Sequence, residues 1–271
     1  MRGIFELGVK SILPLFVVLV GCGKDPVVPV VPVEPIVLEE GVVIAAAADI
    51  TALRERGGDA YIIDGDLQIV GSSLVALTGL EGLRRVEGSV EIWFNDRLES
   101  LTGLEGLESV GAGLGPADAS PPLPTPAAGK AAHVVEGLLI FENKALRSLK
   151  GLENLASVNG GLALVRNESL ASLTDMPHLV EIEGSVDIWY NNALQSLEGL
   201  HYLARVRDFL EVSGNGALQS IDGLRGIGHV GADLIISNNA LLPQSEVWAF
   251  AERMVAEGFA GAVIVQGNLD D

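Results

Sequence analysis

Residues 138–152 read LLIFENKALRSLKGL, and the same arrangement of residue types returns every 24 residues along most of the chain. An aliphatic residue opens each unit, Asn stands at its sixth position, and Leu, Ser-Leu and Gly-Leu follow at fixed distances. Successive units open at Leu138, Leu162, Val186, Leu210 and Leu234. A fixed interval of roughly 20–30 residues is typical of solenoid proteins. We therefore predict a β-rich α/β solenoid built from coils of about 24 residues.

The opening residues of each unit predict a short strand. Residues 186–189 read VDIW, an alternation with a period of two, so the first and third side chains are expected to point inward and the strands to stack in parallel. At the sixth position, a buried amide can bond to the backbone of neighbouring coils. Neutral amides at one per coil make a poor metal site, because hard cations prefer several oxygen ligands that include carboxylates. The expected structural ladder comprises Asn95, Asn143, Asn167, Asn191, Asn215 and Asn239.

The second half of each unit and the two ends of the array predict helical structure. Residues 199–206 read GLHYLARV, whose apolar spacing suits a short helical turn on the back of the solenoid. Terminal coils would expose an apolar cross-section and need caps. Asp49 can cap one terminal helix, and Ser245 can cap another in which Trp248 is expected to pack inward.

These columns resemble the receptor L domain, the leucine-rich-repeat-like solenoid of growth-factor receptor ectodomains and of many bacterial and fungal surface proteins. The resemblance covers residues 61–239 and includes the Asn, Ser-Leu and Gly-Leu columns in register. It implies a right-handed parallel β-helix and a scaffold for protein or glycan recognition. Receptor L domains are usually disulfide-capped and joined to Cys-rich modules, whereas this chain has one Cys, which argues against a growth-factor-receptor role.

The N-terminus has the features of a bacterial lipoprotein signal. Arg2 and Lys10 precede an apolar stretch at residues 12–20, which is too short to cross a bilayer and has the length of a secretory signal core. Residues 19–22 read LVGC and resemble a lipobox, which implies cleavage before Cys22 and lipidation of its thiol. Gly23, in place of the Asp that favours inner-membrane retention, points to the outer membrane. The alternative is a buried free Cys after an ordinary signal.

The predicted organisation separates tails from the repeat array. Prolines at every third position from Pro26 to Pro35 favour a polyproline II stalk over a proline-recognition ligand. The interval from Val90 to Leu138 is 48 residues, and its Pro-rich part is expected to be a degenerate coil extruded as a loop. The predicted segments are a signal peptide at 1–21, a stalk at 22–38, an N-terminal cap at 39–64, repeats at 65–242 with the loop at 115–130, and a C-terminal helix and strand cap at 243–271.

Composition and motif context argue against several functions. The 36 Asp and Glu against 17 Lys and Arg leave no basic surface for nucleic acid. One Cys excludes an intramolecular disulfide framework and a Cys-rich zinc cluster. Residues 226–231 read GIGHVG, but no strand-turn-helix unit precedes this dinucleotide-like string. The repeat places three histidines at different positions of the unit, so they are not expected to form one metal-binding cluster: His178, His201 and His229. We predict no catalytic residue, metal or cofactor, and no enzymatic activity.

The outward row of the strands is the candidate binding surface. It is expected to hold an aromatic and apolar strip beside acidic side chains, about 20 Å long if the degenerate coil occupies one level of the stack. The alternative interpretation is that these residues are there because they favour strands, and that the Pro-rich loop or a cap partly covers the face. A structural envelope protein and a β-helical polysaccharide-degrading enzyme remain alternative functions to a lipid-anchored module that binds a cell-surface protein or glycan. The candidate residues are Trp93, Phe141, Val165, Trp189, Glu91, Asp187 and Glu211.

The lipid anchor can be tested directly. Replacing the lipidated thiol in Cys22→Ser should leave the protein unprocessed or release it into the soluble fraction, because the diacylglycerol has no attachment atom. Detergent phase partitioning of cell fractions measures the outcome. Normal cleavage with retention in the membrane fraction would contradict the lipoprotein interpretation.

Overall fold

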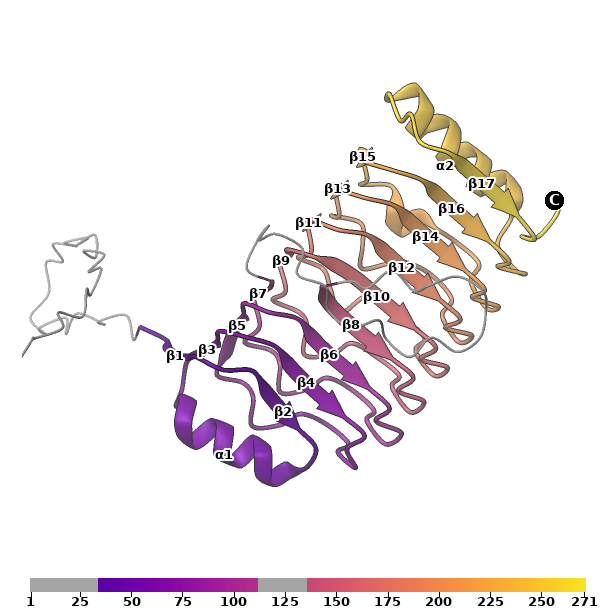
Figure 1. The fold of residues 1–271 in the computed structure, drawn as a ribbon. Helices are drawn as coiled ribbons and strands as arrows, with labels where there is room; N and C mark the ends of the chain where they lie inside the picture. The colour runs from indigo at the N-terminus through magenta and orange to yellow at the C-terminus, as the bar shows by residue number, and fades with distance from the viewer. Residues whose placement is uncertain (1–33, 112–135) are drawn as a thin grey trace, which may run out of the picture. The chain divides into compact units, whose positions relative to one another are not determined.

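The computed structural model describes residues 34–111 and 136–271, and this part is a parallel β-solenoid with few helices (Figure 1). Coils contribute strands to two sheets, which we call sheet A and sheet B. Sheet A consists of β1 (Ile36–Leu38), β3 (Tyr61–Ile63), β5 (Leu83–Val86), β7 (Ser109–Val110), β9 (Ser157–Val158), β11 (Glu181–Ile182), β13 (Arg205–Val206) and β15 (His229–Val230). Sheet B consists of β2 (Val42–Ile44), β4 (Leu67–Val70), β6 (Val90–Trp93), β8 (Gly137–Phe141), β10 (Gly161–Val165), β12 (Val186–Trp189), β14 (Leu210–Ser213), β16 (Leu234–Ser237) and β17 (Val263–Gln266).

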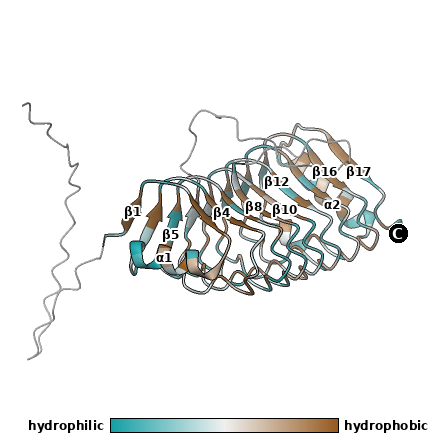
Figure 2. Cartoon of the chain, turned by 60° about the horizontal axis from the view of Figure 1, so that its bottom comes forward, coloured by the Kyte–Doolittle hydropathy of each residue, from teal (hydrophilic) through white to brown (hydrophobic). Residues whose placement is uncertain are grey.

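The 24-residue period is the register between adjacent strands of sheet B. Leu162 of β10 pairs with Leu138 of β8 on one side and with Val186 of β12 on the other. The first and third residues of each repeat unit, such as Leu162 and Leu164, are buried in the core, as the alternation predicts. Figure 2 shows the apolar strands running through the stack and hydrophilic residues among the turns. Neighbouring coils therefore bury one continuous apolar core.

The 48-residue interval joins two coils that are in direct contact. Strand β6 pairs with β8, and Trp93 is opposite Phe141 in that pairing. In sheet A, β7 pairs with β9 in the same way. No coil therefore lies between these strands. The predicted loop at 115–130 lies outside the described residues, as do Cys22 and the predicted signal peptide at 1–21.

The second half of the unit forms turns and a short strand, so the predicted helical turn is wrong for most coils. The N–H of Leu200 donates to the carbonyl of Leu197 (3.2 Å), and that of Leu203 donates to Leu200 (2.9 Å), which makes two separate turns. Gly199 has φ +113°, and a Cβ there would lie 1.9 Å from the Leu173 carbonyl oxygen of the preceding coil. This close approach leaves no room for a side chain at position 199. Among the described residues, a 3₁₀ helix forms at Asp222–Leu224 (η1).

One α-helix lies near each end of the described array. Helix α1 (Ala47–Gly57) packs against β1 and β2, and Asp49 accepts bonds from two backbone N–H groups just before the helix. Helix α2 (Gln244–Ala256) begins before Ser245 and contacts β17. Trp248 is 44% exposed, so the prediction that it packs inward is wrong. The inward face of α2 is already filled by Val247, Phe250, Ala251 and Met254. Among the described helices, none combines the length and apolarity that crossing a membrane requires.

A ladder of buried asparagines runs along the stack beside sheet B. Asn191 donates from Nδ2 to the Leu164 carbonyl (2.8 Å) and accepts from the Asn167 backbone N–H (3.0 Å), so one amide binds two groups of the preceding coil. The ladder begins at the Ser72 backbone N–H and ends at Asn268, whose amide binds the backbone of the coil before it. All six predicted ladder residues are fully buried: Asn95, Asn143, Asn167, Asn191, Asn215 and Asn239.

Asn191→Leu should lower the free energy of unfolding by about 1–3 kcal/mol, because the Leu164 carbonyl and the Asn167 N–H lose their partner inside the core. Chemical denaturation measures the loss. Asn192→Leu is the matched control, since Asn192 is the exposed next residue of the same turn. Equal stabilities of the two variants would contradict a structural role for the ladder.

Candidate binding face

The outer face of sheet B brings the predicted row of side chains into direct register. Trp93 is opposite Phe141, Phe141 is opposite Val165, and Val165 is opposite Trp189. These four residues span three strand intervals of about 4.8 Å, or roughly 14 Å. The row is shorter than the 20 Å expected from the sequence because β6 and β8 are neighbours.

The acidic part of the predicted strip is largely buried. Asp187 is 2% exposed, Glu211 is 8% exposed and Phe141 is 9% exposed, so their prediction as solvent-facing contacts is wrong. In the pairing of β10, β12 and β14, Asp187 lies between Ala163 and Glu211. The remaining candidates are half-buried: Glu91, Trp93, Val165 and Trp189.

Burial changes the charge of this face. Removal from water, together with the nearby Glu211 charge, raises the pKa of Asp187 from 3.8 to about 8. Among the described residues, Asp187 Oδ1 has no hydrogen-bond partner. Glu211 accepts a bond from the Ser213 hydroxyl (3.0 Å). Burial and the neighbouring Asp66 raise the pKa of Glu91, against the effect of the bond donated by Gln68. The face therefore carries less negative charge near neutral pH than the sequence indicates.

Two exposed aromatic residues, which we did not include among the candidates, extend the row. Phe94 is 41% exposed and directly follows β6, where its ring stacks on Trp93 at 5.9 Å and meets Phe141 edge-on at 5.5 Å. Tyr190 is 43% exposed and follows β12, with the Arg166 guanidinium 5.7 Å from its ring centre. We call Trp93, Phe94, Phe141, Trp189 and Tyr190 the aromatic face. The indole N–H groups of both tryptophans are buried and have no partner in the described part.

The exposure of Phe94 and Tyr190 follows from a left-handed backbone. Strict alternation would point the fifth residue of a unit inward and the sixth outward. Phe94 and Tyr190 both have φ 56°, and this turn directs the fifth side chain outward and the ladder asparagine inward. The Phe94 N–H donates to the Phe141 carbonyl (3.2 Å) and the Tyr190 N–H to the Ser213 carbonyl (3.1 Å), which holds the turn to the next coil.

The same backbone conformation recurs at the equivalent position of other coils. Glu142 has φ 50° and Arg166 has φ 55°, whereas glycine occupies this position at Gly71, Gly214 and Gly267. A side chain in the left-handed region costs about 1 kcal/mol relative to the usual conformation. These glycines, each directly before a ladder residue or Ser72, are the sequence signal that could have identified the column.

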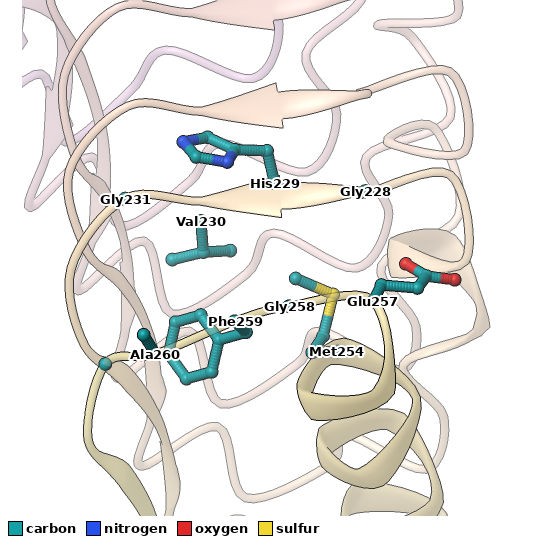
Figure 3. Close-up of a pocket in the computed structure, with 10 residues that line it drawn as sticks. Gly228, His229, Val230, Gly231, Met254, Glu257, Gly258, Phe259 and Ala260 are labelled. Carbon is teal, nitrogen blue, oxygen red and sulfur yellow. The ribbon is translucent and has the colours of Figure 1, made fainter.

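A separate pocket of about 300 Å³ lies between β15 and the connection from α2 to β17 (Figure 3). In Figure 3, the His229 ring lies on the opposite side of the β15 ribbon from Val230 and Phe259. None of the lining residues contributes a buried, unpaired polar side-chain atom, and the described residues contain no cluster of potential metal ligands. The aromatic face is therefore the better candidate for specific recognition.

Comparisons of the chain with models of known protein families, with curated proteins and with solved structures found no match.

The buried carboxyl of Asp187 predicts a pH-dependent stability. Because its folded pKa of about 8 exceeds the ordinary value of 3.8, the folded state holds a proton that the unfolded state releases. The stabilising contribution is complete below about pH 4 and is lost as the pH rises through 8. Relative to the wild type, Asp187→Asn should therefore be more stable at pH 8 than at pH 4.5, by an amount on the order of 3–5 kcal/mol.

Urea denaturation of the variant and the wild type at the two pH values measures this difference. Asp208→Asn, at an exposed position of the same coil, is the control. An unchanged pH dependence in Asp187→Asn would contradict the assignment of the buried proton.

Proposed function

We propose that this chain is a lipid-anchored bacterial cell-surface binding module, without enzymatic activity, that recognises a protein or a glycan through its aromatic face. The observation that carries the proposal is the grouping of Phe94 and Tyr190, both more than two-fifths exposed, with Trp93 and Trp189 on one sheet face. Cys22 would attach the module to the cell envelope, with the lipid anchor as its membrane contact and the outer membrane as the proposed location. In this proposal the solenoid is a right-handed, receptor-L-domain-like β-helix capped by its terminal helices.

The chemistry of the aromatic face supports binding. Trp, Tyr and Arg are the residue types that most often concentrate binding energy in interfaces. The face presents two indoles and a phenol ring beside Arg166 within a few strands. Stacking and edge contacts already fix Phe94, so little side-chain freedom would be lost when a partner binds. The acidic composition of the chain argues against nucleic acid as that partner.

Polysaccharide hydrolysis is the second candidate function. Asp187, whose pKa is raised to about 8, pairs across strands with Glu211, and most glycosidases use a pair of carboxyl groups of which one is a proton donor with a raised pKa. A proton donor must, however, come within hydrogen-bond distance of the bond that is cleaved. Asp187 is 2% exposed, which favours binding over catalysis as the function of this face.

The proposal is tested with the full-length lipidated chain in detergent, screened against surface proteins and glycans. Trp93→Ala combined with Trp189→Ala should weaken binding of the identified partner by about 2 kcal/mol or more, equivalent to about 30-fold. Trp248→Ala is the control, because Trp248 is an exposed tryptophan that lies on α2, outside the aromatic face. Unchanged binding by the double variant, or an equal loss in the control, would contradict the proposed face.

A further inference from the structure

Of the five non-glycine residues in the left-handed column of the described chain, four lie on successive coils at the edge of the aromatic face, and we call them the rim: Phe94, Glu142, Arg166 and Tyr190. We infer that the rim is the primary contact surface of this protein and that its ligand is a neutral, hydroxyl-rich glycan chain. This inference rests on the proposed binding function and adds to it both the contact residues and the class of ligand.

The backbone conformation of the rim indicates that its large side chains serve a purpose other than stabilising the fold. Glycine takes this conformation without a steric penalty, as it does at Gly71, Gly214 and Gly267 in other coils. Phe94 and Tyr190 keep large side chains there although both are more than two-fifths exposed. Strained positions of this kind cluster at binding and catalytic sites, where the surrounding structure holds them.

Contacts among the rim residues fix their side chains in place. Arg166 is 3.5 Å from the Glu142 carboxylate, and its guanidinium also lies over the Tyr190 ring. On the other side, Tyr190 occupies the space above Gly214, where an added Cβ would lie 2.7 Å from the ring. Phe94 is held by Trp93 and Phe141. The rim is therefore ordered before a ligand arrives, which reduces the entropic cost of binding.

The charges of the rim select a neutral ligand. Glu142 and Arg166 form an ion pair and compensate each other. The nearby acidic groups Asp187 and Glu211 are buried on the adjacent strands, so they offer no exposed charge to a basic ligand. The rim residues themselves therefore offer no uncompensated charge to a strongly anionic or cationic chain.

The arrangement of these groups matches a sugar chain. Aromatic rings pack against the apolar C–H faces of sugar rings. The carboxylate and guanidinium between them can accept and donate hydrogen bonds to hydroxyl groups. Phe94 and Tyr190 are separated by three strand intervals, roughly 14 Å, with Glu142 and Arg166 on the coils between them. This length suits several linked sugar residues better than a monosaccharide.

The test uses the full-length chain in detergent and four soluble probes, which are linear hexasaccharides of glucose, mannose, galactose and N-acetylglucosamine. Tryptophan fluorescence and calorimetry should detect binding of at least one probe. Tyr190→Gly and Phe94→Gly should each weaken that binding at least tenfold without lowering the thermal midpoint, because glycine relaxes the strained backbone. Asn238→Gly is the matched control: it has φ 58°, is exposed and lies in the same column away from the aromatic residues, so binding should be unchanged.

Failure of all four probes to bind overturns the glycan inference, as does an equal loss of binding in Asn238→Gly. A lowered thermal midpoint in both rim variants would show that the side chains serve folding, and it would overturn the assignment of the rim to binding. If a protein partner binds in a way that depends on Trp93 and Trp189 while the sugars do not, the glycan inference fails and the proposed function stands. If Trp93→Ala combined with Trp189→Ala leaves sugar binding unchanged, the proposal that the aromatic face is the binding surface is overturned.

Discussion

The structure depends on satisfying the backbone where each coil leaves sheet B. At this point the chain turns beside the core, and backbone groups such as the Leu164 carbonyl and the Asn167 N–H bond to a side-chain amide of the next coil. The asparagine ladder supplies both a donor and an acceptor, as Asn191 does for Leu164 and Asn167 of the preceding coil. Because each amide binds groups of another coil, the ladder also fixes the 24-residue register between strands.

The ladder has a geometric consequence that reaches the surface. An asparagine at the sixth position points inward only if the residue before it leaves the alternation of the strand, and the left-handed turn at that residue does so. The fourth and fifth side chains of a unit, such as Trp93 and Phe94, then both lie on the outer side. The interaction that stabilises the core thus creates paired outward side chains at one edge of the sheet. Where these pairs are aromatic, they form the aromatic face.

The low exposed charge of this face follows from where the structure places its acidic residues on adjacent strands. Glu91, Asp187 and Glu211 read as an exposed acidic row in the sequence, yet the structure buries Asp187 and Glu211 and raises the pKa of Asp187. Placing like charges on adjacent parallel strands favours protonation of one of them. Together with the ion pair between Glu142 and Arg166, this leaves the aromatic rings as the main exposed chemical feature of the face.

The sequence alone determined the parallel solenoid, the inward residues of sheet B and the positions of the asparagines. Each of these features is repeated in every unit, so a local pattern of residue types specifies it. The tertiary structure decided what single coils do differently. Direct pairing of β6 with β8 shortens the row, and the filled inner side of α2 leaves Trp248 exposed. Asp187 likewise lies between Ala163 and Glu211 of the neighbouring coils, and the Tyr190 ring lies over Gly214 of the next coil. These outcomes arise from contacts between residues about one period apart in the sequence. Which residue type stands opposite in the neighbouring coil decides each outcome, and the repeat pattern does not specify that type.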